Sequence, residues 1–385
     1  MSSPFAAIVG GSAGGVVLLV IGILLLYFFG CKGFSNKTSE TGSSDPSTLV
    51  ESNRPGQAPS GCSPSEHQEA RRFSLKELEQ ATNCFGESNL VGVGSFGLVY
   101  KGLLLDGTVV AIKRRQRAPK EEFLEEVNKL SAIWHRHLVN LIGYCQEGGL
   151  QMLVFEYLPN RSISHHLYDT RNQAAKLEFK QRLSIAVGAA KGLSHLYSLT
   201  PPMGHLNFKT SNVLVDENFI AKVADAGIVK LLQRLDDTGP SQASATDIFQ
   251  DPQVGQYGVP SETSDAYSFG VFLLELITGQ EAAGLVSQSP SESLSKLVEA
   301  HLRSNTLIDK RLGGRYTCEG MKELIVLTLR CLSSPGRRPK MVHIARELER
   351  ILETEMTLTI VMGDDTPILE QRNSVRVDQH EKYSL

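Results

Sequence analysis

A glycine-rich pattern around residue 95 is of a type that can bind a phosphate group. Gly92, Gly94 and Gly97 form the pattern G-x-G-x-x-G. Because glycine has no Cβ, backbone N–H groups at such positions can approach phosphate oxygens closely. The pattern by itself also occurs in dinucleotide-binding folds, where it opens a helix, and in ordinary turns. Here strand-like residues follow it at 98–100 and again at 108–113. The sequence therefore predicts a hairpin whose glycine-rich turn covers a phosphate group.

Two further motifs lie in the second half of the chain. The string HLNFKTSN occupies residues 205–212, and DAG follows at 225–227. They resemble the catalytic loop H-R-D-x-K-x-x-N and the metal-binding loop D-F-G of protein kinases, and VAIK at 110–113 matches a third motif of that family. The string FSLKELEQATNCF at 73–85 is similar to the segment that precedes the kinase domain in plant receptor-like kinases. The resemblance to that family continues to residue 355.

The resemblance implies an α+β fold, the bilobal protein-kinase fold. Its N-lobe would hold a five-stranded antiparallel sheet plus a helix, its C-lobe would be mainly helical, and both would follow a single transmembrane helix. A capping box at Ser74 and Glu77 predicts a helix just before the domain. The expected parts of the chain are a transmembrane helix at 5–29, a disordered juxtamembrane linker at 30–71, a helical extension at 72–89, a kinase-like domain at 90–355 (N-lobe 90–157, C-lobe 158–355) and a C-terminal tail at 356–385.

By this resemblance, ATP and Mg²⁺ are the expected cofactors. Lys113 would reach the α- and β-phosphates, with Glu126 as its partner, and Asn212 and Asp225 would hold the metal ion. Glu126 has an alternative reading as a solvated surface charge, because other glutamates lie close by in the sequence. The cationic run 114–120 reads as a solvated loop. The residues that the resemblance assigns to nucleotide binding are Val91, Gly92, Val93, Gly94, Ser95, Phe96, Gly97, Val99, Ala111, Lys113, Glu126, Phe155, Glu156, Leu158 and Leu214.

The catalytic loop departs from the family on its substrate side, although Lys209 is retained. Asn207 stands in place of the catalytic aspartate, and its amide can orient a hydroxyl group but cannot take up the proton. A positioned base is typically worth about 10²–10⁴ in rate. Leu206 replaces the arginine that would pair with a phosphate on the activation segment. The candidate phosphorylation sites of that segment are Thr238, Ser241, Ser244 and Thr246.

Two more departures accompany them. Ala226 replaces a buried phenylalanine, which costs about 3–5 kcal/mol unless neighbouring side chains refill the space. Gln253 replaces a glutamate, so we expect Arg338 to face a neutral amide and to lack a counter-charge. Asp265, which anchors the catalytic loop in the family, is retained. The domain is therefore expected to keep its fold while phosphoryl transfer is lost or weak.

Three functions are consistent with these residues. The first is a pseudokinase that binds ATP and acts as a scaffold or allosteric partner of an active receptor-like kinase or another signalling protein. The second is a weakly active serine/threonine kinase that transfers the γ-phosphate of ATP to protein hydroxyl groups. The third is an interaction module that does not bind nucleotide. ATP binding separates the first from the third, and phosphoryl transfer separates the second from both.

The N-terminal residues predict a membrane anchor. Residues 5–29 carry no charge, and a helix of that length spans about 37 Å, enough to cross a hydrocarbon core of about 30 Å. A cleaved signal peptide is the alternative, but no basic residue precedes the span. Lys32 and Lys37 follow it, which places the kinase-like domain in the cytosol, at the plasma membrane in the simplest case. The net charge of −3 predicts no nucleic-acid partner. Two overlapping G-x-x-x-G pairs would permit self-association, through Gly10, Gly14, Gly11 and Gly15.

Overall fold

The computed structural model describes residues 70–168, 177–236, 247–253, 261–287, 293–303 and 306–362. Outside these ranges lie the predicted transmembrane helix with its glycine pairs, nearly all of the predicted linker, the candidate phosphorylation sites and most of the predicted tail. Among the helices of the described ranges, none is both long and apolar enough to cross a membrane.

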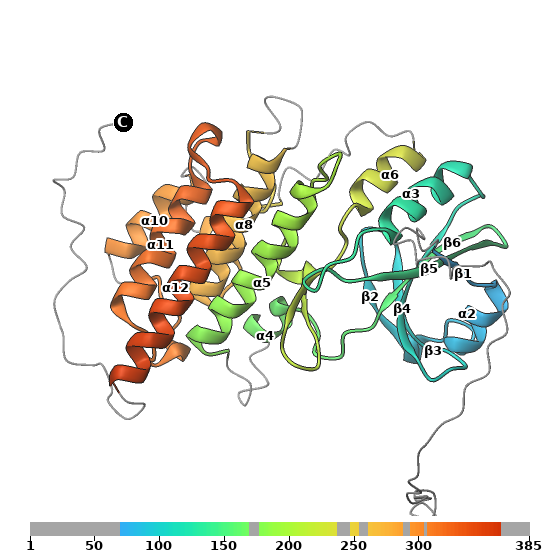
Figure 1. Cartoon of the computed structure of the whole chain (residues 1–385), viewed down its shortest axis with the longest axis horizontal. Coiled ribbons are helices and arrows are strands. Elements are labelled where there is room, and N and C mark those ends of the chain that lie inside the picture. The colour runs from blue at the N-terminus through green and yellow to red at the C-terminus, as the bar shows by residue number, and fades with distance from the viewer. Residues whose placement is uncertain are drawn as a thin grey trace, which may run out of the picture. The chain divides into compact units, whose positions relative to one another are not determined.

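The N-terminal lobe is built on a six-stranded sheet with the strand order β1-β5-β6-β4-β3-β2 (Figure 1). The antiparallel pairing of β2 to β6 confirms the predicted five-stranded sheet and the glycine-rich hairpin between β2 and β3. The strands are β1 (Arg71–Arg72), β2 (Leu90–Val93), β3 (Leu98–Leu103), β4 (Val109–Gln116), β5 (Leu141–Glu147) and β6 (Leu150–Glu156).

The sixth strand, β1, was not predicted. Arg71 and Arg72 pair in parallel with Gly143 and Tyr144 of β5, so ordered structure begins inside the stretch predicted as linker. The two strands approach so closely that a Cβ at Gly143 would lie 2.1 Å from the carbonyl oxygen of Arg71. Only glycine fits there. This strand was not predictable from the sequence, because two exposed arginines carry no strand pattern of their own.

The extension that follows β1 is part of the N-terminal lobe. Phe73 and Leu78 are fully buried in a cluster with the sheet. The helix α2 (Leu75–Ala81) begins at the predicted capping box, in which the Ser74 hydroxyl accepts from the backbone N–H of Glu77 and the Glu77 carboxylate accepts from that of Ser74. Such a cap is worth about 1 kcal/mol.

The C-terminal lobe is mainly helical, as predicted, around the buried helix α8 (Glu262–Thr278), in which every residue from Ser264 to Thr278 is buried (Figure 1). Gly279 ends α8 in the left-handed conformation, with φ 64°. The last helix reaches Met362, past residue 355, where the kinase-like domain was predicted to end. The other elements are α4 (Ile163–Tyr168), α5 (Phe179–Ser198), α9 (Ala282–Ser287), α10 (Leu294–Arg303), α11 (Cys318–Leu332), α12 (Met341–Met362) and the hairpin β7 (Val213–Val215) and β8 (Ala221–Val223).

One helix of functional importance was not predicted. The helix α6 (Ile228–Asp236) starts directly after Gly227 of the DAG motif and lies beside α3 (Glu121–Ser131) of the N-terminal lobe (Figure 1). The apolar residues of both helices interlock with the tip of the glycine-rich loop, and we call this group the α3–α6 cluster. It consists of Phe96, Phe123, Val127, Leu130, Ile228, Leu231 and Leu235, together with Leu153 and Phe155 of β6.

Candidate functional site

One carboxylate, that of Asp265, holds the backbone of the loop that carries Asn207. Asp265 of α8 is 1% exposed and accepts backbone N–H groups of His205 at 2.7 Å and Leu206 at 2.9 Å, with the Tyr197 hydroxyl donating at 2.5 Å. This confirms the predicted anchoring role of Asp265. Leu206 is held in the left-handed region at φ 61°, which costs about 1–2 kcal/mol for a side chain with a Cβ. The bonds to Asp265 offset that strain.

Asn207 occupies the base position in an otherwise ordered loop. Its carbonyl oxygen accepts from the Asn212 amide at 2.9 Å, and its N–H donates to His205 Nδ1 at 3.4 Å. Burial lowers the pKa of His205, so the ring is neutral and its Nε2–H donates to the Ala224 carbonyl at 2.8 Å. The next residue, Phe208, stacks on Phe269 of α8 with ring centroids 5.5 Å apart. These bonds fix the backbone of the loop around Asn207, whose side chain is an amide and not a carboxylate.

Lys113 and Asp225 form an ion pair with each other. The Ser95 hydroxyl of the glycine-rich loop donates to the other Asp225 oxygen at 3.3 Å. Burial lowers the pKa of the Lys113 amine to about 8, while the adjacent Asp225 carboxylate favours its charged form. The two groups that the resemblance assigned to phosphates and metal thus neutralise one another. A phosphate on Lys113 or a metal ion on Asp225 would compete with this ion pair.

The expected partnership of Lys113 with Glu126 is not formed in this structure. Glu126 is 2% exposed and binds Lys129 at 2.8 Å and the Arg234 guanidinium of α6. Burial raises the pKa of the Glu126 carboxyl, but the hydrogen bonds from Lys129 and Arg234 outweigh it and leave that pKa below its ordinary value. The solvated-charge alternative is also wrong, because the side chain is buried. The physical reason is α6, which brings a cation to Glu126 that the sequence analysis did not foresee.

The cationic run 114–120 contacts the C-terminal end of α6. Arg115 and Arg117 bind Asp236 at 3.2 and 3.4 Å, and the Lys120 ammonium donates to the Leu235 carbonyl. Cations at the last turn of a helix also interact favourably with its dipole. The interpretation of this run as a solvated loop holds for residues 117–120, which are exposed, but is wrong for Arg115, which lies in β4 with a side chain that is 9% exposed. A signal for α6 was present, since Ile228, Leu231 and Leu235 repeat at helical spacing.

The glycine-rich loop is folded onto itself and onto the α3–α6 cluster. The Gly94 N–H donates to the Gly97 carbonyl at 2.8 Å, and the Gly97 N–H donates back at 3.2 Å. Phe96, at the tip, is 2% exposed, with the Arg115 guanidinium 5.0 Å from its ring centroid. Gly97 has φ 141°, and a Cβ there would lie 2.3 Å from the Arg114 carbonyl oxygen. The N–H groups of Gly94 and Gly97 are thus used within the loop.

The residues expected around adenine lie on neighbouring elements. Val99 of β3, Ala111 of β4 and Leu214 of β7 are half-buried, while Val91 and Val93 are 58% and 78% exposed. Phe155 and Leu158 are buried along β6 and just beyond it. The Glu156 carboxylate accepts from the Lys222 ammonium and from the Asn140 N–H, each at 2.8 Å. Val99, Ala111 and Leu214 supply apolar side chains of the kind that pack on adenine, and Asn212 with Asp225 would supply oxygen ligands suited to Mg²⁺ once Lys113 is displaced.

The DAG motif that contains Ala226 is closely packed. Ala226 itself is half-buried against the core of the C-terminal lobe. A Cβ at Gly227 would lie 2.4 Å from Leu130 Cδ2 and 3.1 Å from Met203 Sδ, and Ile228 is fully buried in the α3–α6 cluster. This packing belongs to the closed arrangement in which Lys113 binds Asp225.

The prediction that Arg338 lacks a counter-charge is wrong. Its guanidinium binds the Asp251 carboxylate twice, at 2.5 and 3.1 Å, and donates to the carbonyls of Thr263 and Ser333. The side chains of Arg338 and Asp251 are 2% and 3% exposed. Gln253 contributes its backbone N–H to Asp251 instead of an amide to Arg338. The acid that the buried arginine requires thus lies two residues before the position at which the family has its glutamate.

Comparison with known proteins identifies the family. Residues 86–348 match the family described as protein tyrosine and serine/threonine kinase. The proline-rich receptor-like protein kinase PERK3 of Arabidopsis thaliana is 36% identical over 385 residues, covering 97% of this chain and 70% of PERK3. This chain belongs to the protein kinases, among the receptor-like kinases. The chain spans 40% of the length of another relative from that plant, the proline-rich receptor-like protein kinase PERK2, with 37% identity over 72% of this chain.

Solved structures similar to this receptor-like kinase include pseudokinases. The pseudokinase domain of BIR2, an immune regulator of the RLK/Pelle family, has a TM-score of 0.61 and 29% identity, with 73% of this chain and 86% of that chain covered. The pseudokinase DRIK1, a drought responsive inactive kinase bound to ENMD-2076, has a TM-score of 0.56 and 26% identity, with 74% and 98% covered. The bilobal kinase fold with a sheet-based N-lobe and a helical C-lobe is therefore shown.

The ion pair between Arg234 of α6 and Glu126 in this receptor-like kinase gives a testable prediction. Arg234→Ala removes the guanidinium that binds Glu126 and should tighten Mg·ATP binding by about fivefold, because this ion pair no longer favours the closed arrangement. Isothermal titration of the full chain measures this. Lys230→Ala, which removes an exposed cation from the same helix, is the matched control and should leave the dissociation constant unchanged. Equal effects of the two variants would show that the ion pair does not control the site.

Proposed function

We propose that this chain is a receptor-like pseudokinase that binds Mg·ATP and serves as a scaffold or allosteric partner of an active kinase in phosphorylation signalling. The observation that carries the proposal is Asn207. It sits in a catalytic loop that Asp265 holds in order, and its amide cannot accept a proton. The pseudokinases among the similar solved structures support the same reading.

In this proposal, binding of Mg·ATP changes the conformation of the domain. Mg·ATP needs Lys113 and Asp225 apart, whereas the closed arrangement keeps them bound to each other and holds Glu126 on α6. A ligand that binds one arrangement better shifts the population toward it. Binding of Mg·ATP would therefore release Phe96 and α6 from the α3–α6 cluster and change the surface of α3. That surface change, without phosphoryl transfer, is the signal that a partner would detect.

Membrane anchoring is the second part of the proposal. It rests on the uncharged residues 5–29 and on the cations Lys32 and Lys37 that follow them. The names of the relatives, which are receptor-like protein kinases, agree with it. Anchoring at the plasma membrane would place the domain beside membrane-bound kinases and raise its effective concentration toward them.

The test uses the full chain in detergent micelles. We expect Mg·ATP to raise the thermal unfolding midpoint, by an amount equivalent to about 2.7 kcal/mol at a hundredfold excess over the dissociation constant. Transfer of radiolabelled phosphate should stay at background, and Lys113→Ala should remove the thermal shift. Robust transfer that Lys113→Ala abolishes would identify an active serine/threonine kinase instead. Absence of a shift at millimolar nucleotide would leave an interaction module.

A further inference from the structure

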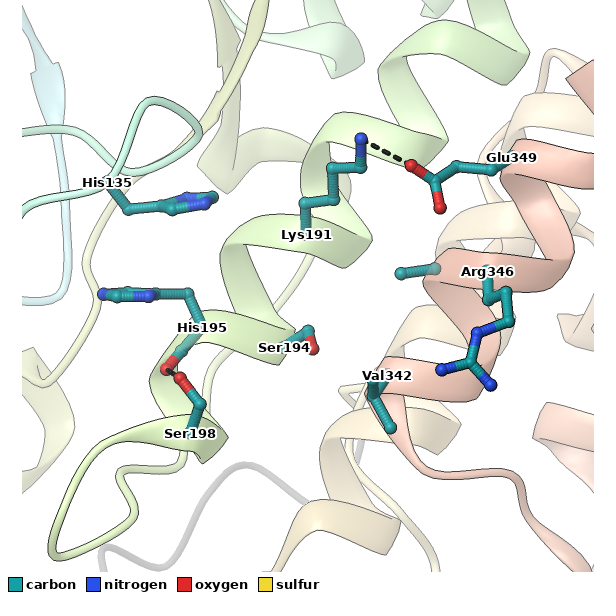
Figure 2. A pocket seen from close by; sticks show the side chains of 9 residues that line it. His135, Lys191, Ser194, His195, Ser198, Val342, Arg346 and Glu349 are labelled. Carbon is teal, nitrogen blue, oxygen red and sulfur yellow. Dashed lines mark hydrogen bonds and ion pairs between the residues drawn. The ribbon is translucent and has the colours of Figure 1, made fainter.

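A groove on the C-terminal lobe is not used by the site described above. It has a volume of about 370 Å³ and lies between α5 and α12, with His135 from the loop after α3 at one end (Figure 2). Each helix contributes four lining residues at the spacing i, i+3, i+4 and i+7, which places them on one face of that helix. Small side chains, Ser194, Ser198 and Ala345, leave the space between the two helices open.

The groups around this groove are mainly hydrogen-bond donors. Arg346 is exposed, and it makes neither an ion pair nor a hydrogen bond with any residue in the described ranges; in Figure 2 no dashed line joins it to the other residues drawn. Lys191 reaches across to Glu349 at 2.5 Å. The Ser194 hydroxyl lines the same space. The His195 ring is held by stacking on His135, with centroids 4.7 Å apart and planes 11° from parallel.

The charges around the groove suit a small anion, such as a phosphate group, better than an extended anionic surface, such as a membrane. Arg346 also lines a second hollow of about 220 Å³, together with Arg330 of α11 and His343 of α12. Two carboxylates are interspersed among them, Glu349 bound to Lys191 and Glu347 bound to Arg350. A membrane surface responds to the summed charge of such a face, which these carboxylates reduce. A phosphate inside the groove responds to the donors within hydrogen-bond reach.

We propose that this groove binds a phosphorylated serine or threonine segment of a partner protein. Arg346 supplies the planar, bidentate guanidinium that recognises a phosphate, and Lys191 and the Ser194 hydroxyl supply further donors. A phosphoserine brings about −1.5 to −2 charges and three acceptor oxygens to these groups. Val342, which is 44% exposed at the rim, contacts the apolar part of the segment. This inference rests on the proposed function, because an active kinase partner carries such phosphorylated segments.

The experiment measures binding of an oriented peptide library with a central phosphoserine, and of its unphosphorylated counterpart, to the full chain in detergent micelles. The phosphorylated library should bind at least about tenfold more tightly. Arg346→Gln should remove that difference. Glu349→Gln should strengthen binding by about fivefold, because it frees Lys191 and removes a carboxylate from the groove. Lys322→Gln, an exposed cation of α11 outside both hollows, is the matched control and should change nothing.

Three results would overturn the inference. Equal binding of both libraries, or unchanged discrimination in Arg346→Gln and Glu349→Gln, would show that the groove does not recognise phosphate. Binding to phosphatidylserine-containing vesicles that Arg346→Gln abolishes, without peptide discrimination, would assign the cations to a membrane surface. The thermal shift with Mg·ATP is measured on the same variants and should be unaffected. A chain that binds nucleotide but not phosphopeptide therefore contradicts this inference alone, and loss of the shift in the unmodified chain contradicts the proposed function.

Discussion

Asp251→Ala is expected to lower the free energy of unfolding by about 3–5 kcal/mol, because it leaves the buried Arg338 guanidinium without its counter-charge. Both side chains are almost completely removed from water, so solvent cannot replace the lost carboxylate. Guanidinium chloride denaturation of the full chain, followed by tryptophan fluorescence or circular dichroism, measures the change.

The control for this prediction lies two residues away. Gln253→Ala should change the free energy of unfolding by no more than about 0.5 kcal/mol, since Gln253 contributes its backbone N–H to Asp251 and keeps it in the variant. If instead Gln253→Ala is as costly as Asp251→Ala, then Arg338 depends on the amide, as the sequence analysis proposed. Asp251→Asn is the smaller change and should fall between the two.

Asn207→Asp is expected to raise the rate of phosphoryl transfer by about 10²–10⁴-fold over the unmodified chain. Asn and Asp have nearly the same shape, and the Asp265 bonds that hold the loop are backbone bonds that the substitution leaves in place. The new carboxylate can accept the proton that the amide cannot. Transfer from radiolabelled ATP to a protein substrate measures the rate, with Lys113→Ala in the same background as the inactive control.

The closed arrangement should limit this gain without abolishing it. Adding Arg234→Ala to Asn207→Asp should multiply the rate by about fivefold, because the base acts on the chemical step and the ion pair acts on the population of open molecules. The affinity for Mg·ATP should be unchanged by Asn207→Asp alone. A rise of less than tenfold in that single variant would show that Leu206, Ala226 or the closed arrangement, and not the missing base, is the main defect.

The fold was largely predictable because its signals are local. The capping box before α2 and the glycine-rich hairpin each specify an element from neighbouring residues. The motifs around Asn207 and Asp225 then indicate how these elements assemble, and the anchoring of the loop by Asp265 was found as expected. The parallel strand β1 was missed because a two-residue strand depends on a neighbour that has room for it, here Gly143.

Local motifs are enough to locate the charged groups of the site in this receptor-like kinase, but the packing of distant segments selects the partner of each group. Lys113 has Asp225 as its partner instead of Glu126, and Arg338 has Asp251 instead of Gln253. Each choice depends on segments far apart in the chain. The pairing of Lys113 also depends on α6, which binds Glu126 and is a short helix that becomes stable only when its apolar face packs against α3. Which charged groups pair depends on their distance and their burial in the folded chain, and local sequence patterns specify neither. The motifs thus identify a kinase-like site, whereas its closed arrangement, with Lys113 bound to Asp225, results from the packing of α6 against α3.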